Sequence, residues 1–170
     1  TKARVLIAMD LTNNSADNLR RIVIASEELN TDGTPKTGSW ILSSRGIVLP
    51  DQVFFSKTYS MSDQARQLGF GATSEMSLAS PTFKAAYAGK YLFYEFNAEG
   101  ICTTPGASFV VGAGARGGTA AAQKGLPMVT NAGKRDFGGF VVWRNGRTST
   151  FRSPEQIGSG LRNIKSGDKF

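Results

Sequence analysis

Short stretches in which apolar and polar residues alternate occur along most of the chain. The first runs from Arg4 to Leu11, and the second runs from Leu19 to Ser26. A period of two places alternate side chains on opposite faces, which is typical of a half-buried β-strand. Tyr91 to Asn97 is the most strand-like run because it is rich in aromatic residues, and we expect it to be a central strand.

Turn-forming residues lie inside two predicted hairpins. In the first hairpin, residues 39–42 and 46–49 flank a short polar turn. In the second hairpin, residues 140–144 and 147–152 flank the dipeptide Asn145-Gly146. Because Asn-Gly tolerates the two positive φ values of a type I′ turn, we predict that turn type for the second hairpin.

Two segments that lie between predicted strands have the boundaries of short helices. Residues 60–69 and residues 80–89 each begin with a serine that can cap a helix and end with a glycine that can stop one. Such residues are the usual start and stop signals of a helix. We therefore predict two short helical insertions between Phe55 and Tyr91.

The spacing of the predicted strands indicates the fold class. About eight to ten short strands, with no repeat or domain linker between them, predict an all-β fold. The expected architecture is an antiparallel β-sandwich that is immunoglobulin-like in general form. The length of 170 residues is typical of one domain, so we expect residues 1–170 to form a single β-sandwich domain. Residues 158–170 are polar and contain glycine, which predicts a mobile tail.

The composition excludes many kinds of catalytic and metal site. The chain contains no histidine and a single cysteine, Cys102. The lack of histidine removes the usual base of nucleophilic sites and the commonest transition-metal ligand. One cysteine permits neither an internal disulfide nor a multi-cysteine metal site. We therefore predict a protein that is not an enzyme and holds no cofactor or metal. We expect Cys102 to be a small buried apolar residue, and an intermolecular disulfide or an anchor at Cys102 is the alternative.

Positive charge is concentrated in the last third of the chain. Residues 1–110 hold ten Lys/Arg and ten Asp/Glu, whereas residues 111–170 hold ten and three, so the net charge of +7 belongs to the second range. Converging cations would favour an anionic partner, and solvated loop charge is the alternative. The candidate anion-binding residues lie around the Asn145-Gly146 turn or near it in the sequence: Arg116, Lys134, Arg135, Arg144, Arg147 and Arg152.

Three short motifs match catalytic or binding patterns, and each has a simpler interpretation. Residues 112–117 match the dinucleotide pattern GxGxxG, but no helix long enough to bind a phosphate can follow, so we predict a flexible loop. Residues 166–169 match SxxK in the expected tail, where catalytic groups cannot be held in place. Glu27, Glu28 and Asp32 could supply the paired carboxylates of a glycan hydrolase, and solvated positions are the favoured alternative.

Two groups of residues resemble a known family. The first comprises residues 96–100 (FNAEG), 103–106 (TTPG) and 108–111 (SFVV), and the second comprises Trp40, Leu49-Pro50 and Val53-Phe54. Both groups are similar to the signature of H-type minor pseudopilins and the related FimT-like minor pilins. The resemblance covers residues 40–152 of this chain.

The resemblance implies an all-β globular head that follows an N-terminal membrane helix and assembles at a type IV pilus or a type II secretion machine. FimT-like proteins contact DNA through a C-terminal Gly/Arg-rich region, which residues 146–152 partly match. This chain has no prepilin cleavage motif and opens with a strand-like run. A leader or anchor removed before Thr1 is left open, and a secreted β-sandwich protein associated with a pilus-like gene cluster is the alternative.

These observations lead to one functional hypothesis and one alternative. The hypothesis is a non-enzymatic, extracytoplasmic structural or adhesive module of a pilus-like or secretion system, in the periplasm, in the outer membrane or at the cell surface. Its partners would be other pilus-like or envelope proteins, and no apolar run in the chain is long enough to span a membrane. The alternative is an anion- or nucleic-acid-binding module that contacts DNA or an acidic glycan through the basic C-terminal third.

Overall fold

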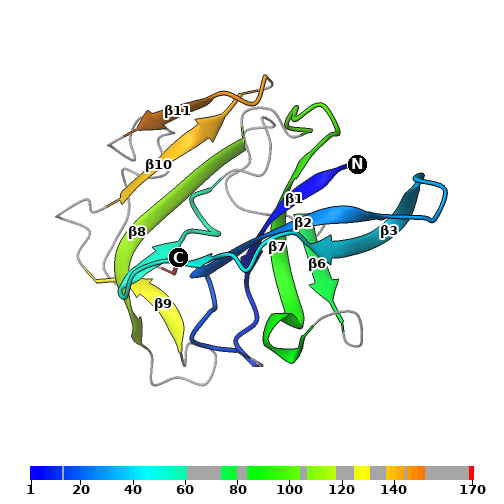
Figure 1. Cartoon of the computed structure of the whole chain (residues 1–170). Coiled ribbons are helices and arrows are strands. Elements are labelled where there is room, and N and C mark those ends of the chain that lie inside the picture. Colours follow the sequence, from blue (N-terminus) through cyan, green and yellow to red (C-terminus); the bar gives the residue numbers. More distant parts are fainter. Residues whose placement is uncertain are drawn as a thin grey trace.

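The protein is built from two antiparallel β-sheets, which lie on opposite sides of the molecule in Figure 1. The computed structural model describes residues 1–12, 14–60, 74–79, 84–103, 107–117, 125–130, 137–143, 145–151 and 169–170. Within these ranges one sheet contains six strands and the other contains five. The predicted all-β, antiparallel fold class is therefore confirmed.

The six-stranded sheet, called sheet A, is formed mostly by the first half of the chain. Its strands are β1 (Ala3–Ala8), β2 (Arg21–Leu29), β3 (Pro35–Leu42), β4 (Ile47–Val48), β6 (Glu75–Leu78) and β7 (Gly89–Phe96). Their order is β3-β2-β1-β7-β6, and β4 pairs with β2. Both β3 and β4 pair with β2, β3 along residues 25–29 and β4 along residues 21–22.

The five-stranded sheet, called sheet B, is formed mostly by the second half of the chain. Its strands are β5 (Val53–Phe55), β8 (Ala107–Gly117), β9 (Leu126–Val129), β10 (Phe137–Val142) and β11 (Thr148–Phe151). Their order is β11-β10-β8-β5, and β9 pairs with β8. The long strand β8 is therefore the element that connects the other strands of this sheet.

The two sheets pack on one shared core. Ile7, Leu92 and Tyr94 of sheet A belong to the same buried cluster as residues of β5, β8, β9, β10 and β11. The ring of Phe55 is fully buried, and its centre lies 4.8 Å from that of Phe109 and 6.4 Å from that of Tyr94. Aromatic packing across the two sheets therefore joins the two halves of the chain.

The opposite face of sheet A carries a second buried apolar cluster. It contains Leu6, Ala8, Val23, Ala25, Trp40, Leu78 and Tyr91. The Arg4 guanidinium lies 4.1 Å from the centre of the Trp40 ring and 3.8 Å from that of Phe93. It also donates two hydrogen bonds to the Glu95 carboxylate, at 2.9 and 2.7 Å. Both faces of β1 are therefore covered, which explains why both sets of its alternate positions contain apolar residues.

The two predicted helical insertions are not confirmed. Residues 61–69 of the first prediction lie outside the described residues. Residues 80–83 of the second prediction also lie outside the described residues; in its described part, residues 84–89, Ala85–Tyr87 form a 3-10 helix, η2, and strand β7 already begins at Gly89. The reason is strand pairing, because Gly89 and Lys90 pair with β6. No helix in the described part of the chain is long and apolar enough to cross a membrane.

The GxGxxG stretch is part of a strand, and the predicted flexible loop is wrong. Residues 112–117 form the second half of β8, where they pair with strands β5, β9 and β10. A Cβ atom at Gly112 would lie 2.5 Å from the Phe137 ring, and one at Gly114 would lie 2.3 Å from the Phe170 ring. These glycines make room for aromatic side chains of the core, and composition alone does not reveal that role.

The second predicted hairpin is confirmed as β10 and β11, but its loop differs from the prediction. Val142 pairs with Thr148, and the Trp143 N–H donates to the Arg147 carbonyl at 2.8 Å, so the strand pairing ends at Trp143 and Arg147. The Gly146 N–H donates back to the Trp143 carbonyl at 2.9 Å, and Gly146 has a φ of +76°. This is the pattern of a turn followed by a glycine bulge, not of a two-residue type I′ turn.

The last two residues are anchored in the core, although the sequence predicts a mobile tail over residues 158–170. Phe170 is only 5% exposed. The centre of its ring lies 5.6 Å from that of Phe54 and 5.7 Å from that of Phe137. The remainder of the predicted tail, residues 158–168, lies outside the described residues, so the correction concerns Lys169 and Phe170.

The packing of the glycines in β8 gives a direct test of the core. We expect Gly114→Ala to lower the free energy of unfolding by about 1–3 kcal/mol, because the new methyl group would meet the Phe170 ring and the Met128 carbonyl oxygen. Gly117→Ala is the matched control in the same motif, since the nearest atom to its Cβ is a sulfur 3.8 Å away. Equal urea denaturation midpoints for the two variants would contradict this account of the motif.

Candidate functional site

A groove of about 690 Å³ lies beside the edge of sheet A, between the β3–β4 connection and the 3-10 helix η2. Its lining residues are Ile41, Leu42, Ser43, Ser44, Arg45, Lys84, Ala86 and Tyr87. Two of these side chains, Arg45 and Lys84, are cationic, and none is acidic. We call this feature the cationic groove.

The β3–β4 connection forms one wall of the cationic groove and is held in a fixed shape. Gly46 has a φ of +73°, and a Cβ atom there would lie 2.2 Å from a carbonyl oxygen of β2, so glycine is required where the chain returns to the sheet. The Ser43 hydroxyl donates to Ser26 Oγ at 2.8 Å, and the Ser44 hydroxyl accepts the Ile24 N–H at 3.2 Å. These contacts place Ser43, Ser44 and Arg45 along the wall.

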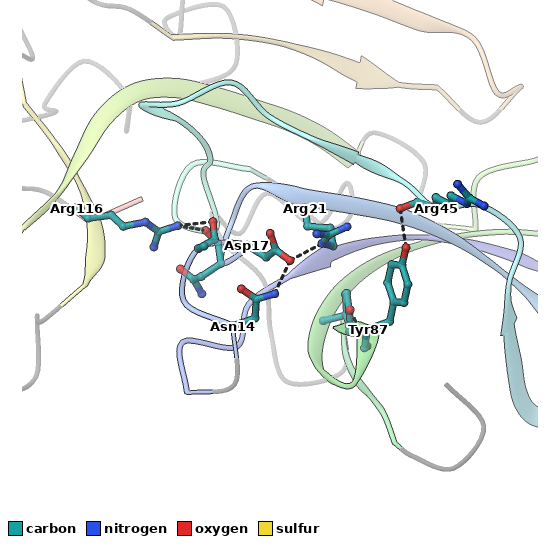
Figure 2. Close-up of polar contacts among 9 residues, drawn as sticks. Asn14, Asp17, Arg21, Arg45, Tyr87 and Arg116 are labelled. Atoms are coloured by element: carbon teal, nitrogen blue, oxygen red, sulfur yellow. Dashed lines mark hydrogen bonds and ion pairs between the residues drawn. The ribbon is translucent and has the colours of Figure 1, made fainter. Parts of the chain in front are cut away.

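The opposite wall is centred on Tyr87. Its hydroxyl donates to the Arg45 carbonyl at 3.4 Å, which connects the two walls (Figure 2). The Tyr91 hydroxyl donates to the Tyr87 carbonyl at 2.8 Å. The Arg21 guanidinium carbon lies 5.5 Å from the centre of the Tyr87 ring. Both the main chain and the ring of Tyr87 are therefore held by neighbouring residues.

An ion pair on the Arg21 side of Tyr87 supports this wall. Asp17 is buried, with 7% of its surface exposed, and it accepts hydrogen bonds from Arg21 Nε and, at 2.6 Å, from Asn14 Nδ2 (Figure 2). The hydrogen bond to Asp17 raises the pKa of Arg21 above its usual value. The charge of Arg21 is thus neutralised within the protein, and its role at the groove is to position Tyr87.

The two cations that line the groove are not neutralised in this way. Arg45 and Lys84 are exposed, and neither forms an ion pair with any residue in the described ranges. By contrast, Lys57 pairs with Glu75 at 2.8 Å. The positive charges of Arg45 and Lys84 are therefore available to a bound anion.

Neither of these cations is among the site residues that the sequence predicts. Arg45 lies in the polar turn of the first predicted hairpin, and Lys84 lies in a segment that was predicted to be helical. They are 39 positions apart in the sequence, and no local spacing links them. The only early signal is the position of Arg45 in a turn, where side chains are usually exposed.

One of the predicted anion-binding residues, Arg116, uses its guanidinium to hold the main chain of neighbouring segments. Its guanidinium donates to the carbonyl oxygens of Gly125, Ala16 and Asn18 at 3.0, 3.1 and 3.0 Å, and Figure 2 shows the two bonds to the segment before β2. Burial lowers the pKa of Arg116. All three bonds go to main-chain carbonyls, so Arg116 joins β8 of sheet B to the segment that leads into sheet A.

The other predicted anion-binding residues are not brought together within the described residues. Arg147 is exposed in the β10–β11 hairpin, and its main-chain N–H donates to Asn145 Oδ1 at 3.1 Å. Lys134, Arg135, Arg144 and Arg152 lie outside the described residues. Their convergence with Arg147 stays a prediction.

The carboxylates of Glu27, Glu28 and Asp32 are not arranged as the catalytic pair of a glycan hydrolase. Glu27 and Glu28 are consecutive in β2, so their side chains point to opposite faces of the sheet. Hydrogen bonds from Ser39 and Lys36 lower the pKa of the Glu28 carboxyl, and hydrogen bonds from Thr34 lower that of Asp32. Glu27 and Glu28 therefore do not form a pair of cooperating carboxylates.

A second candidate surface is an apolar cleft of about 280 Å³ between the two sheets. Its lining residues are Val5, Ile22, Ile47, Leu49, Tyr94, Phe96, Phe109, Phe140 and Val142. The lining comes from β1, β2, β4 and β7 on one side and from β8 and β10 on the other. The cleft is therefore an extension of the shared core that opens to the surface.

Exposed apolar side chains continue from this cleft along sheet A. Ile24, Ile41 and Ile47 are 45%, 44% and 62% exposed, and we call these three residues the apolar shelf. Ile24 pairs with Val5 and Ile47 pairs with Ile22, both of which line the cleft. Because paired residues of antiparallel strands point to the same face, the apolar shelf lies on the face of sheet A that carries the cleft.

No match to a known protein assigns a function to these surfaces. A scan against protein-family models finds no match, and searches of curated proteins and of solved structures find none either. Within the described part of the chain, no group of three Cys, Asp or Glu residues is placed to hold a metal ion. Function is therefore inferred from the residues that line the groove, the cleft and the shelf.

The position of Arg116 leads to a prediction about stability. We expect Arg116→Gln to lower the free energy of unfolding by about 1–3 kcal/mol, because its three carbonyl acceptors would lose a charged donor. Arg147→Gln, which removes the same charge from an exposed position, should leave the urea denaturation midpoint nearly unchanged. Weaker retention of the Arg116 variant on heparin, with unchanged stability, would instead assign Arg116 to an anion-binding surface.

The burial of Tyr91 predicts a loss of stability at alkaline pH. Burial raises the pKa of Tyr91 to about 12. In the unfolded chain, the pKa of a tyrosine side chain is about 10. As the pH rises from about 10 to about 12, the unfolded state releases this proton and the folded state keeps it, so unfolding becomes more favourable. Tyr91→Phe should therefore lose less stability between these pH values than the wild type in urea titrations. An identical pH dependence of the two proteins would contradict the assignment.

Proposed function

We propose that this protein is a non-enzymatic, extracytoplasmic structural or adhesive module of a pilus-like or secretion system. It contacts a neighbouring protein of that assembly through the apolar shelf and the adjoining cleft. The observation that carries the proposal is the gathering of exposed apolar side chains on one part of sheet A.

The distribution of these side chains supports a protein contact surface. Among the described residues, the exposed large apolar side chains are Ile24, Leu29, Ile41, Ile47, Val48 and Trp143. Three of these, Ile24, Ile41 and Ile47 of the neighbouring strands β2, β3 and β4, lie together on the face of sheet A that carries the cleft. Single exposed apolar residues are ordinary, but a contiguous group marks a site of interaction. A partner that covers the apolar shelf would gain the free energy of removing it from water.

The cleft adds a specific feature to this surface. It is wide enough for one or two apolar side chains of a partner, and its walls carry no charged residue. A buried apolar anchor in a pocket, surrounded by weaker contacts, is typical of protein interfaces. We therefore assign the cleft to an anchor residue of the neighbouring protein.

The family resemblance and the fold class agree with this proposal. An all-β head is what the resemblance to H-type pseudopilins and FimT-like minor pilins implies, and two sheets on a common core are compatible with it. The finer description, an immunoglobulin-like sandwich, is part of the proposal. The alternative remains an anion- or nucleic-acid-binding module, favoured by the net charge of +7 in residues 111–170.

Genetic complementation in the native organism tests the structural role. Deletion of the gene should reduce surface filaments or secreted protein, and the wild-type gene should restore them. We expect Ile24→Lys/Ile47→Lys to be folded but unable to restore assembly, because two charges would lie on the contact surface. Filaments counted by electron microscopy and secreted protein measured in the medium are the readouts.

Leu29→Lys/Val48→Lys is the matched control for this experiment. Leu29 and Val48 are 49% and 44% exposed, and alternation along β2 and β4 places them on the face opposite to the apolar shelf. This variant should assemble like the wild type. Full complementation by the Ile24/Ile47 variant would exclude the apolar shelf as the contact surface, and normal assembly in the deletion strain would exclude the structural role itself.

A further inference from the structure

We propose that the cationic groove binds an acidic oligosaccharide, that is, a short chain of sugar residues that carries carboxylate or sulfate groups. This binding function differs from the protein contact proposed for the apolar shelf, and Ile41 is the shelf residue that also lines the groove. It uses Arg45, Lys84, Tyr87 and the two serines of the groove wall, all of which lie in the described residues.

The charge of the groove selects an anion. Arg45 and Lys84 both line it, none of the described residues that line it is acidic, and neither cation has an ion-pair partner in the described part of the chain. Other cations of sheet A differ in this respect, because Arg4 pairs with Glu95 at 2.7 Å and Arg20 pairs with Asp51 at 2.7 Å. A carboxylate or sulfate in the groove would accept charge-assisted hydrogen bonds from Arg45 and Lys84.

The hydroxyl groups of the groove match those of a sugar. Ser44 Oγ accepts the Ile24 N–H at 3.2 Å, which leaves its own proton available for a ligand acceptor. Tyr87 uses its proton on the Arg45 carbonyl at 3.4 Å, which leaves its oxygen available to accept a sugar hydroxyl. The groove thus offers a donor and an acceptor for neutral hydroxyl groups next to its two cations.

Size and surface also fit a saccharide. The groove of about 690 Å³ is within the range of about 300–1,000 Å³ that small-molecule sites occupy. Leu42, Ala86 and the half-buried Tyr87 ring supply apolar surface for the C–H face of a sugar ring. A single-stranded nucleic acid is less well matched, because its successive bases stack on several aromatic side chains, and among the described residues that line the groove only Tyr87 is aromatic.

The walls of the groove are fixed before any ligand binds. Gly46, Ser43 and Ser44 hold one wall on β2, and Tyr91 and Arg21 hold Tyr87 on the other. A preformed site loses less conformational freedom on binding than a mobile one. The support of Tyr87 by the buried Asp17–Arg21 pair therefore contributes to affinity without contact with the ligand.

Calorimetric titration of the purified protein tests the proposal. The probes are tetragalacturonate, its uncharged methyl ester and a thymidine tetranucleotide. We expect the wild type to bind tetragalacturonate at least about tenfold more tightly than the ester or the nucleotide. Arg45→Gln/Lys84→Gln should weaken the binding of tetragalacturonate by about tenfold or more and reduce its dependence on salt concentration.

Lys90→Gln/Lys169→Gln is the matched control, because it removes two exposed cations that do not line the groove and that form no ion pair with any described residue. It should bind tetragalacturonate within about twofold of the wild type. Circular dichroism and melting curves establish that each variant is folded. The proposal is overturned if the wild type does not bind tetragalacturonate, if the ester or the tetranucleotide binds equally well, or if the two double variants lose affinity equally.

Discussion

The packing of Phe55 between the two sheets is the contact on which the rest of the structure depends. Its side chain is fully buried against Phe109 of sheet B and Tyr94 of sheet A. Its N–H donates to the Leu19 carbonyl at 2.7 Å, and the Leu19 N–H donates to the Ala8 carbonyl at 2.7 Å. One core residue therefore joins the sheets and also fixes the segment that precedes β2, where Leu19 adopts a φ of +56°.

The segment that precedes β2 connects the core to the wall of the cationic groove. It carries Asp17, whose ion pair with Arg21 places a guanidinium beside the Tyr87 ring. Arg116 holds the same segment from sheet B through the carbonyls of Ala16 and Asn18. The wall of the cationic groove is thus supported by residues from both sheets, and a disturbance of the core should alter the groove.

The distribution of charge illustrates the difference between a sequence and a surface. The sequence predicts an anion-binding region from the excess of positive charge in residues 111–170. Among those cations, Arg116 donates to main-chain carbonyls, and Lys134, Arg135, Arg144 and Arg152 lie outside the described residues. Arg45 and Lys84, which have no ion-pair partner among the described residues, share a groove although they belong to a range whose net charge is zero. Net charge counts residues, whereas binding depends on which charges are paired and where they lie.

The sequence by itself determined the fold class, because alternating apolar residues and turn formers act through neighbours in the chain. It also determined the burial of Cys102, which is 1% exposed. Only the tertiary structure decided that the glycines at 112 and 114 belong to a strand, since the Phe137 and Phe170 rings that require them come from distant segments. The same holds for the cationic groove and for the anchoring of Phe170. Each of these depends on contacts between residues that are far apart in the chain, and local periodicity carries no information about such contacts.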